Sequence, residues 1–501
     1  LLQAIKILEL TSDIPHVTRG SCGSSLVCYL LGISNVDPVL YNIKFSRFLN
    51  EYRNNLPDID FDFPHYKRDE VFIRISKKWP NQIARISNHI HFHRKSAERE
   101  ALRKLGYHNF IDKYSVQKII DKLPITQKIK FEKIVNELEG TFRTYSLHCG
   151  GIVFYPEGVP SELKINNGLI DQVNLDKRDV SKDKNFKIDI LSSKGISQLH
   201  MYYSSINKEL SFTETMTDTR VFNLFKKGDN TGITLAESPL IRKTFLMFQP
   251  DTVEDLAICL SVIRPIARES RKEGKVQGLI YDDDAIDLIK NYFNVSEDYA
   301  DKLRREFSKN NFDSLKSLNE EYKKNYKYDN LPDSLKELGM YSFCKAHAMS
   351  YAQLIYKLAE FKINNPTEFW ESAIKNCTSS YKKWVHPFEA SKVGALYNKT
   401  KEKSIYCKEK CNNEDSPIEQ LKKSGLWSFE ICSFIPNCYL IKRIINDNEI
   451  YYFSALIAHI RVLSITSKKK SLVCLLCDGK DYFEMNTCLL YTSDAADEEA
   501  W

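Results

Sequence analysis

The sequence predicts an α+β protein, with a sheet in its first part and a mainly helical remainder. Segments 57–63 and 186–191 alternate charged residues with large apolar ones, and a period of two is typical of strands. Segment 93–141 is instead rich in Lys and Glu with helical periodicity, and helices are also expected from about 193 to 400. The strands that bear charged side chains are therefore expected before residue 193.

The composition is that of a globular protein. The 501 residues allow about two to four domains with substantial cores. Charged residues make up 28% and hydrophobic residues 43%, and the net charge of +6 leans mildly toward polyanionic partners. No apolar run reaches the roughly 18 residues of a membrane span, and no secretory signal is visible. With 13 scattered cysteines, we expect a cytoplasmic protein in a reduced compartment and no membrane partner.

An acidic strand is the most informative feature. In segment 57–63, Asp58, Asp60 and Asp62 alternate with apolar residues, so the three carboxylates share one strand face. Carboxylates roughly 6–7 Å apart repel each other, and Asp is a poor strand former, so a cation is expected to neutralise them. Mg²⁺ binds carboxylates together with substrate phosphates, and pairs of such ions promote in-line phosphoryl displacement. A solvated strand face is the alternative interpretation of this pattern.

A turn of small residues precedes the acidic strand. Gly20 and Ser21 belong to a Gly/Ser-rich segment at 19–25, where the backbone can approach an anion closely. The apolar run 26–31 is expected to form a buried helix, whose N-terminal N–H groups would add to a phosphate site. The alternative is a plain turn that caps this helix. Because the acidic strand follows roughly 35 residues later, the pair favours a nucleoside triphosphate bound by phosphates and metals.

A third carboxylate is expected from another strand, because two-metal sites usually need one. Asp189 lies in the alternating segment 186–191, where Lys187 shares its face. The alternative for these two residues is a structural ion pair at the edge of a strand.

A basic stripe follows the acidic strand. Lys95, Arg99 and Arg103 recur every four residues, which places them on one helix face. Contact with nucleic-acid phosphates is one interpretation, and a solvated face paired with neighbouring Glu side chains is the other.

Three segments, 19–38, 45–63 and 67–71, together resemble the palm of the family C DNA polymerases, the bacterial replicative polymerase III α subunits. Order and spacing match without gaps. The resemblance implies a β-like nucleotidyltransferase palm with a mixed sheet, a helical thumb insertion and large, mainly helical fingers.

The resemblance also implies roles for single residues. The catalytic aspartates, which would hold two Mg²⁺ ions, are Asp60, Asp62 and Asp189, with Asp58 as an outer acid. The residues expected to meet the triphosphate or the incoming nucleotide are Gly20, Ser21, Lys187, Arg304, Arg305 and Lys345. Those expected to contact DNA are Lys95, Arg99 and Arg103. His148, in a segment that matches a family strand, is expected to be structural.

The domain organisation follows the same resemblance. Residues 1–92 and 142–192 are expected to form the palm, 93–141 the thumb, 193–400 the fingers and 401–487 an uncertain continuation. Residues 488–501 look like a translated sequencing adapter rather than native protein, and the chain is expected to be an internal fragment. The implied partners are primer–template DNA, deoxynucleoside triphosphates and, in the full-length protein, the sliding clamp and other replisome subunits.

The sequence therefore predicts the catalytic core of a DNA-templated DNA polymerase, which adds deoxynucleotides to a primer 3′-hydroxyl by two-metal phosphoryl transfer. A metal-dependent nuclease or phosphodiesterase that uses the same carboxylates is an alternative, although it leaves the Gly20 and Ser21 turn unexplained. An inactive DNA-binding fragment is another, although the retained aspartates argue against lost chemistry.

Overall fold

The computed structural model describes residues 1–53, 58–107, 115–166, 168–182, 185–323, 325–339, 343–377, 385–387, 389–390, 393, 395, 456–464, 470–477 and 482–489. They divide into two compact units. The first comprises Leu1–Ser34 and Phe48–Ser192, and the second comprises Asn35–Arg47 with the described residues from Ser193 onward.

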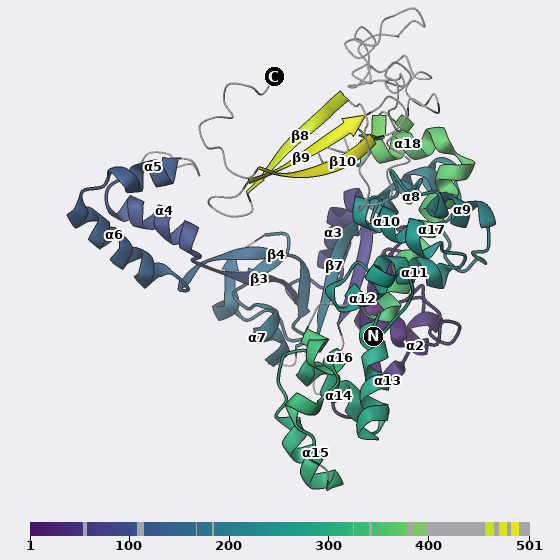
Figure 1. Ribbon diagram of the computed structural model, residues 1–501, viewed down its shortest axis with the longest axis horizontal. Coiled ribbons are helices and arrows are strands. Elements are labelled where there is room, and N and C mark those ends of the chain that lie inside the picture. Colours follow the sequence, from purple (N-terminus) through teal and green to yellow (C-terminus); the bar gives the residue numbers. More distant parts are fainter. Residues whose placement is uncertain are drawn as a thin grey trace, which may run out of the picture. The chain divides into compact units, whose positions relative to one another are not determined.

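A seven-stranded sheet with the order β1-β2-β7-β4-β3-β6-β5 forms the centre of the first unit (Figure 1). Its strands are β1 (Val17–Arg19), β2 (Ile59–Pro64), β3 (Ile83–His91), β4 (Phe142–Phe154), β5 (Lys164–Asn166), β6 (Asp171–Val173) and β7 (Lys187–Ser193). β3 pairs in parallel with β6, whereas β1–β2, β4–β7, β3–β4 and β5–β6 pair antiparallel. The sheet is therefore mixed, and the predicted combination of a mixed sheet with helices is confirmed.

Seven helices lie among the described residues of the same unit. They are α1 (Leu2–Leu10), α2 (Leu26–Leu30), α3 (Arg68–Lys78), α4 (Arg94–Lys104), α5 (Ser115–Lys122), α6 (Ile125–Leu138) and α7 (Lys177–Lys182). Short 3₁₀ turns lie at Ser21–Ser24, His65–Lys67 and Ser161–Leu163.

The two faces of the sheet differ because side chains alternate along each strand. One face is apolar and packs against α1 and α3. Its core includes Ile59, Phe61 and Phe63 of β2 and Ile188 and Ile190 of β7. The charged residues between them, on β2 and β7, consequently point to the other face, where α7 covers a smaller apolar cluster on β3, β4 and β6.

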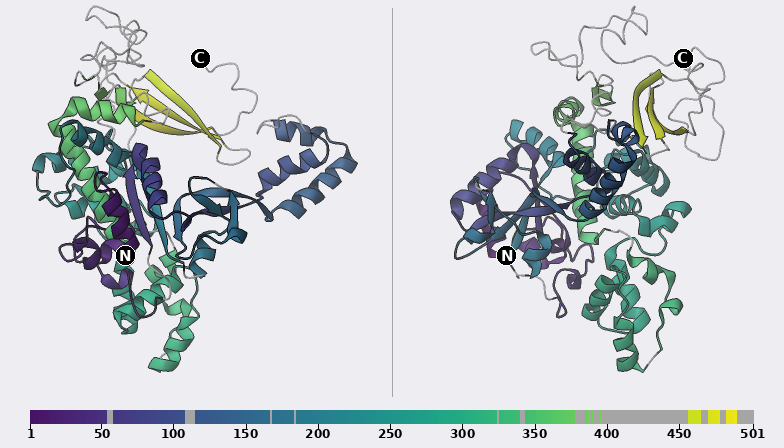
Figure 2. Two further views of the ribbon diagram at one scale, coloured as in Figure 1. Left: turned by 180° about the vertical axis from the view of Figure 1, so that it is seen from behind. Right: turned by 90° about the vertical axis from the view of Figure 1, so that its left-hand side faces the viewer.

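The helices α4, α5 and α6 form a module inserted between β3 and β4 (Figure 2). The module has an apolar cluster of its own, with Ala97, Ala101 and Leu102 of α4 packed near Phe131 and Val135 of α6. The half of β4 that leads away from the module is buried, whereas the half next to it is largely exposed.

The second unit is mainly helical among its described residues. Its helices are α8 (Lys194–Ser205), α9 (Thr219–Lys226), α10 (Pro239–Phe248), α11 (Val253–Ser261), α12 (Arg268–Glu273), α13 (Asp282–Phe293), α14 (Glu297–Phe307), α15 (Ser314–Tyr322), α16 (Asp333–Lys336), α17 (Lys345–Asn364) and α18 (Pro366–Lys375). It also has 3₁₀ turns at Phe45–Arg47, Pro265–Ala267, Tyr328–Asn330 and Glu337–Gly339.

A three-stranded antiparallel sheet lies late in the chain. It consists of β8 (Leu456–Ser464), β9 (Lys470–Cys477) and β10 (Tyr482–Leu489). The predictions for 401–455 and for 490–501 fall outside the described residues. Within the described ranges, no helix combines the length and the apolarity needed to cross a membrane.

The prediction of a buried helix at 26–31 was wrong. Helix α2 has only five residues, and Cys28 alone among them is buried. Leu30 keeps 72% of its side-chain surface exposed. The run is apolar on every side, so its composition gave no indication that most of it faces outward.

We expect the core of the first unit to depend strongly on Phe61. Its ring is fully buried between β2 and the helices, so Phe61→Ala should lower the free energy of unfolding by about 3–5 kcal/mol. The measurement is chemical denaturation followed by circular dichroism. The control is Leu30→Ala, which removes an exposed side chain and should change stability by about 0.5 kcal/mol or less. Equal effects of the two changes would contradict this description of the core.

Candidate active site

Neighbouring strands bring the predicted acids together. In the register of β1 and β2, Asp60 lies opposite Arg19 and Asp62 opposite Val17. β7, which carries Asp189, is the next strand in the sheet, and Asp189 lies opposite Gly151 of β4. Residues about 130 positions apart in the chain thus share the face opposite the apolar core.

Cationic side chains surround the carboxylates. The Lys187 ammonium nitrogen lies 2.6 Å from Oδ2 of Asp189 and 3.7 Å from Oδ1 of Asp58. Lys177, at the start of α7, lies 2.9 Å from the other oxygen of Asp58. Burial alone would raise the pKa of Asp58. The positive charges of Lys187 and Lys177 outweigh that effect and hold the pKa below its ordinary value. Asp58 is thus already neutralised by two lysines.

Asp62 has a different counterion. The Arg19 guanidinium lies 3.5 Å from Asp62 Oδ1, and only 2% of the Asp62 side chain is exposed. The acid at the centre of the run therefore lies between one carboxylate paired with lysines and another paired with arginine.

Asp60 is the least compensated carboxyl group of the run. Burial raises its pKa from 3.8 to about 7, and the negative charge of Asp189 acts in the same direction. Within the described part of the chain, Oδ1 of Asp60 and Oδ1 of Asp189 are both buried and accept no hydrogen bond. Unsatisfied buried acceptors are costly, and oxygen-only donor sets of this kind suit hard divalent cations. These residues therefore fit a Mg²⁺ ion.

The predicted phosphate turn adjoins Asp60. Gly20 has φ of +87°, and a Cβ placed on it would lie 3.7 Å from Asp60 Oδ2. A larger residue at Gly20 would be strained by that φ and would face the carboxylate. Ser21 and Ser24 are buried in the turn, and among the described residues Ser24 Oγ meets no partner. Helix α2 contributes little, since it is short and its Ser25 side chain already caps Cys28 N–H.

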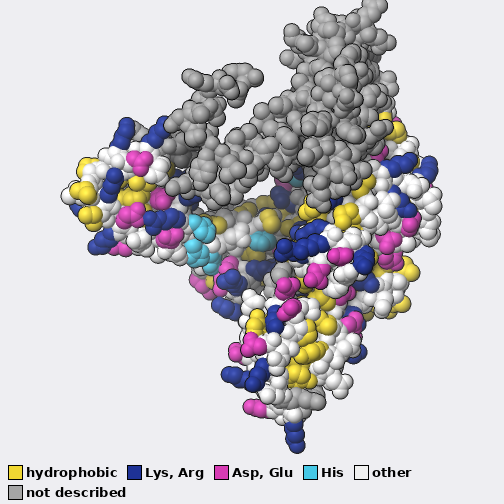
Figure 3. Space-filling view, viewed as in Figure 1, with side chains coloured by type: hydrophobic (Ala, Val, Ile, Leu, Met, Phe, Trp, Pro, Cys, Tyr) yellow, Lys and Arg dark blue, Asp and Glu magenta, His cyan; other side chains and the backbone are white. Residues whose placement is uncertain are grey.

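The basic stripe lies on α4, away from the acids. Lys95 and Arg103 are exposed, and Arg103 lies 2.8 Å from Glu100. Arg99 is partly buried and contacts the Lys95 carbonyl. Figure 3 shows basic side chains interspersed with acidic and apolar ones over the module, and a histidine patch where it joins the sheet. The three residues share a helix surface, and their contact with DNA stays a prediction.

The predicted nucleotide-contacting residues of the second unit have partners of their own. Arg304 is buried, with its guanidinium 2.9 Å from Asp301 and 3.5 Å from Asp282. Arg305 lies 3.1 Å from the second oxygen of Asp301. The backbone N–H of Lys345 donates to Asp283 at 2.7 Å, which anchors the start of α17. A role of these residues toward nucleotide stays a prediction.

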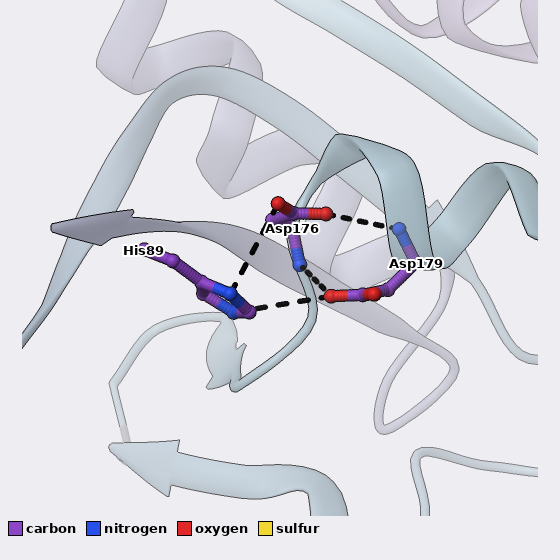
Figure 4. Close-up of side chains that lie close together, drawn as sticks. All are labelled: His89, Asp176 and Asp179. Carbon is purple, nitrogen blue, oxygen red and sulfur yellow. Dashed lines mark hydrogen bonds and ion pairs between the residues drawn. The ribbon is translucent and has the colours of Figure 1, made fainter. Parts of the chain in front are cut away.

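A second group of potential metal ligands is formed by His89, Asp176 and Asp179 (Figure 4). His89 Nε2 lies 2.6 Å from the Asn174 carbonyl, which can only accept, so this nitrogen carries the proton. Asp176 Oδ1 accepts the N–H groups of Arg178 and Asp179, and Asp179 Oδ2 accepts the N–H of Asp176. The two carboxylates therefore cap the start of α7, and we assign this group a structural role.

The sequence assigned no role to Arg19 or Lys177 and a structural one to His148, and all three line the acid face. Arg19 directly precedes the predicted phosphate turn, which was a usable signal. Lys177 comes from α7, and nothing in its spacing links it to Asp58. His148 Nδ1 lies 3.9 Å from Asp189 Oδ1, a contact that only the pairing of β4 with β7 produces.

The sequence of the chain is similar to known proteins. Residues 8–192 match the profile of the bacterial DNA polymerase III alpha NTPase domain, and residues 197–277 match that of the bacterial DNA polymerase III alpha subunit finger domain. DNA polymerase III subunit alpha of Staphylococcus aureus strain MRSA252 is 28% identical over 433 residues, and that of Staphylococcus epidermidis is 28% identical over 432. The chain belongs to the bacterial DNA polymerase III α-subunit family.

The resemblance inferred from the sequence motifs is thereby confirmed. Each alignment covers 75% of this chain and 40% of the relative, so the chain spans about 40% of the length of the curated relatives it matches. The acid face described above lies within the first matched domain of the polymerase III α family.

We expect the stability of the metal-free protein to depend on Asp60 and pH. Because the folded state raises the Asp60 pKa to about 7, it binds this proton more tightly than the unfolded state does. The contribution of Asp60 to the free energy of unfolding should therefore fall as the pH rises from about 4 to 7, by on the order of 1–4 kcal/mol. Denaturation curves across this pH range, without divalent cations, provide the measurement.

The control for this pH dependence is Asp60→Asn, which should flatten the decline. Adding Mg²⁺ should restore stability most strongly near pH 7, because a cation binds the ionised carboxylates. The difference between the wild-type and Asp60→Asn profiles isolates Asp60, and a difference that does not change between pH 4 and 7 would argue against this environment.

Proposed function

We propose that this chain provides the catalytic core of a DNA-templated DNA polymerase that adds deoxynucleotides to a primer 3′-hydroxyl. The observation that carries the proposal is the meeting of Asp60 and Asp189 from adjacent strands, each with a buried oxygen that accepts no hydrogen bond from the described residues. Their position beside the Gly20 turn supports a triphosphate substrate, and the names of the relatives support polymerisation.

Two Mg²⁺ ions would be held by Asp60, Asp62 and Asp189. Bound there, the ions would lower the pKa of the attacking hydroxyl and balance the charge of the pyrophosphate leaving group. The raised pKa of Asp60 supports this assignment, because such a carboxyl group gains most from a nearby divalent cation.

The side chains around the acids would orient the reactants. The primer 3′-hydroxyl gives its proton to water, its oxygen forms a bond to the α-phosphorus, the bond from that phosphorus to the bridging oxygen breaks, and pyrophosphate leaves. Gly20 and Ser21 would let the backbone approach the phosphates, and Arg19 would hold Asp62 in position. The Lys187 ammonium group, which pairs with Asp189, would also contact phosphate oxygens when the cations and the nucleotide bind.

The proposed division of labour follows the family. Residues 1–92 and 142–192 would act as palm, 93–141 as thumb, and 193–400 as fingers. Lys95, Arg99 and Arg103 of the thumb would contact the DNA backbone. Lys345, Arg304 and Arg305 would act on the incoming nucleotide, the two arginines only after the Asp301 ion pairs rearrange. Primer–template DNA and deoxynucleoside triphosphates are the proposed partners, joined in a longer protein by a sliding clamp and other replisome subunits.

Primer extension tests the proposal directly. Asp60→Ala, Asp62→Ala and Asp189→Ala should each reduce Mg²⁺-dependent extension by about 10³-fold or more, since each removes a ligand from the reacting centre. Binding of primer–template DNA, followed by fluorescence anisotropy, should remain. The matched control is Asp69→Ala, whose carboxylate is 88% exposed on α3 and which should keep normal extension.

The same assay distinguishes the alternatives. Retained extension by the Asp60 and Asp62 variants would refute the assignment. Degradation of DNA with Mg²⁺, without any nucleotide-dependent extension, would favour a nuclease. Binding of DNA without either reaction, in the wild-type protein, would favour an inactive DNA-binding fragment.

The basic stripe on α4 gives a separate prediction. Lys95→Ala and Arg103→Ala should each weaken DNA binding without regard to sequence and reduce the slope of log K against log salt concentration by about 1. The matched control is Lys78→Ala on α3, which lies on the apolar side of the sheet. Unchanged slopes for the α4 variants would remove this surface from the proposed DNA interface.

A further inference from the structure

A bulge interrupts β4 beside Asp189. Arg85 and Ser87 of β3 pair with Ile152 and Leu147 of β4, so one β3 residue, Ile86, faces the four β4 residues 148–151. Extra residues of this kind bend a strand and redirect its side chains, and they are frequent beside active sites. The β4–β7 ladder reaches Gly151, the partner of Asp189, and therefore ends within this bulge.

The ring of His148 satisfies the N–H groups of the bulge. Its Nδ1 accepts the N–H of Gly151 at 2.8 Å and that of Gly150 at 3.3 Å. An imidazole nitrogen that accepts carries no proton, so a neutral His148 has its hydrogen on Nε2.

Arg85 satisfies the carbonyl groups of the same bulge from the other side. Its guanidinium donates to the carbonyls of His148 at 2.8 Å and Cys149 at 3.3 Å, and it lies over the ring of Phe72. The bulge thus has an acceptor for its N–H groups and a donor for its carbonyls. These four hydrogen bonds join the bulge to two side chains and restrict its geometry.

The glycines leave no free space around the bulge. A Cβ at Gly150 would lie 2.6 Å from the Ile190 carbonyl oxygen, and one at Gly151 would lie 2.5 Å from the Ile86 side chain and 2.9 Å from His148 Nδ1. The backbone of β4 therefore packs directly against β7 on one side and against the His148 ring on the other. A shift of the bulge would move the backbone that pairs with Asp189.

We propose that His148 is a positioning residue for the acid centre, acting through its unprotonated Nδ1 on the bulge that fixes Asp189. The inference rests on the proposed function, and it assigns His148 no proton transfer and no contact with the substrate. Asp189 needs such support because its Oδ1 accepts no hydrogen bond from the described residues, and Lys187 holds only its Oδ2. Residues that orient metal-binding side chains act in this indirect way.

Three substitutions test this role. In His148→Asn, the amide oxygen is bonded to Cγ as Nδ1 is, so it keeps the acceptor in place. In His148→Gln, the amide group is one carbon further from the backbone, and His148→Ala has no acceptor. We expect His148→Ala and His148→Gln to lower kcat for primer extension about 10- to 100-fold and to raise the Mg²⁺ concentration that gives half the maximal rate. His148→Asn should stay close to the wild type in kcat and in this Mg²⁺ concentration. The KM for nucleotide should change little in all three variants.

Two measurements do not depend on polymerase activity. Mn²⁺ binding, followed by electron paramagnetic resonance without nucleotide, should be weaker in His148→Ala and His148→Gln than in the wild type and His148→Asn. Nitrogen NMR of the wild-type protein labelled at histidine should find the His148 proton on Nε2. Thermal denaturation of each variant shows which of them fold. The NMR measurement uses only the wild-type protein, so it remains valid if a variant fails to fold.

The outcomes separate this inference from the proposed function. A proton on Nδ1, or equal Mn²⁺ affinity and kcat for His148→Asn and His148→Gln, would overturn the positioning role. If the wild-type protein extends no primer, the polymerase proposal fails, while Mn²⁺ binding and the NMR result still decide the role of His148.

Discussion

Electrostatic repulsion among buried carboxylates is the constraint on which the first unit depends. Asp60 and Asp189 lie on adjacent strands, and burial strengthens the repulsion between them because little water screens it. The sheet can hold them there because their neighbours in sequence are anchored in the apolar core on its other face. The stability of that core is thus partly offset by charges that are useful only when a cation or a phosphate arrives.

The cations of the protein limit this repulsion unequally. Lys177 and Lys187 form ion pairs with Asp58, and Arg19 forms one with Asp62. The uncompensated negative charge is therefore concentrated on Asp60. The three acids, of which Asp58 directly precedes β2 and the other two lie on it, thereby acquire three different environments. The outer two carboxylates are held by side chains of the protein, and the central one remains available.

The sequence predicted the parts of this arrangement that are local. Alternation revealed β2 and β7, because a strand that is buried on one face must repeat every two residues. The period of four in Lys95, Arg99 and Arg103 likewise matched helix α4. The sequence could not predict contacts that depend on the packing of strands and helices. His148 contacts the β4 glycines only because of a bulge. Lys177 contacts Asp58 only because α7 packs nearby. The exposure of α2 was also missed, since an apolar composition is compatible with either side of a surface.

The α4–α6 module begins and ends on paired residues, because His91 of β3 lies opposite Phe142 of β4. Its apolar cluster is separate from those on both faces of the sheet. A segment with adjoining ends and its own core can change length, or be exchanged for a short hairpin loop, without moving the strands beneath it. The length and sequence of the module can therefore change during evolution, while the register of the strands that carry the acids stays fixed.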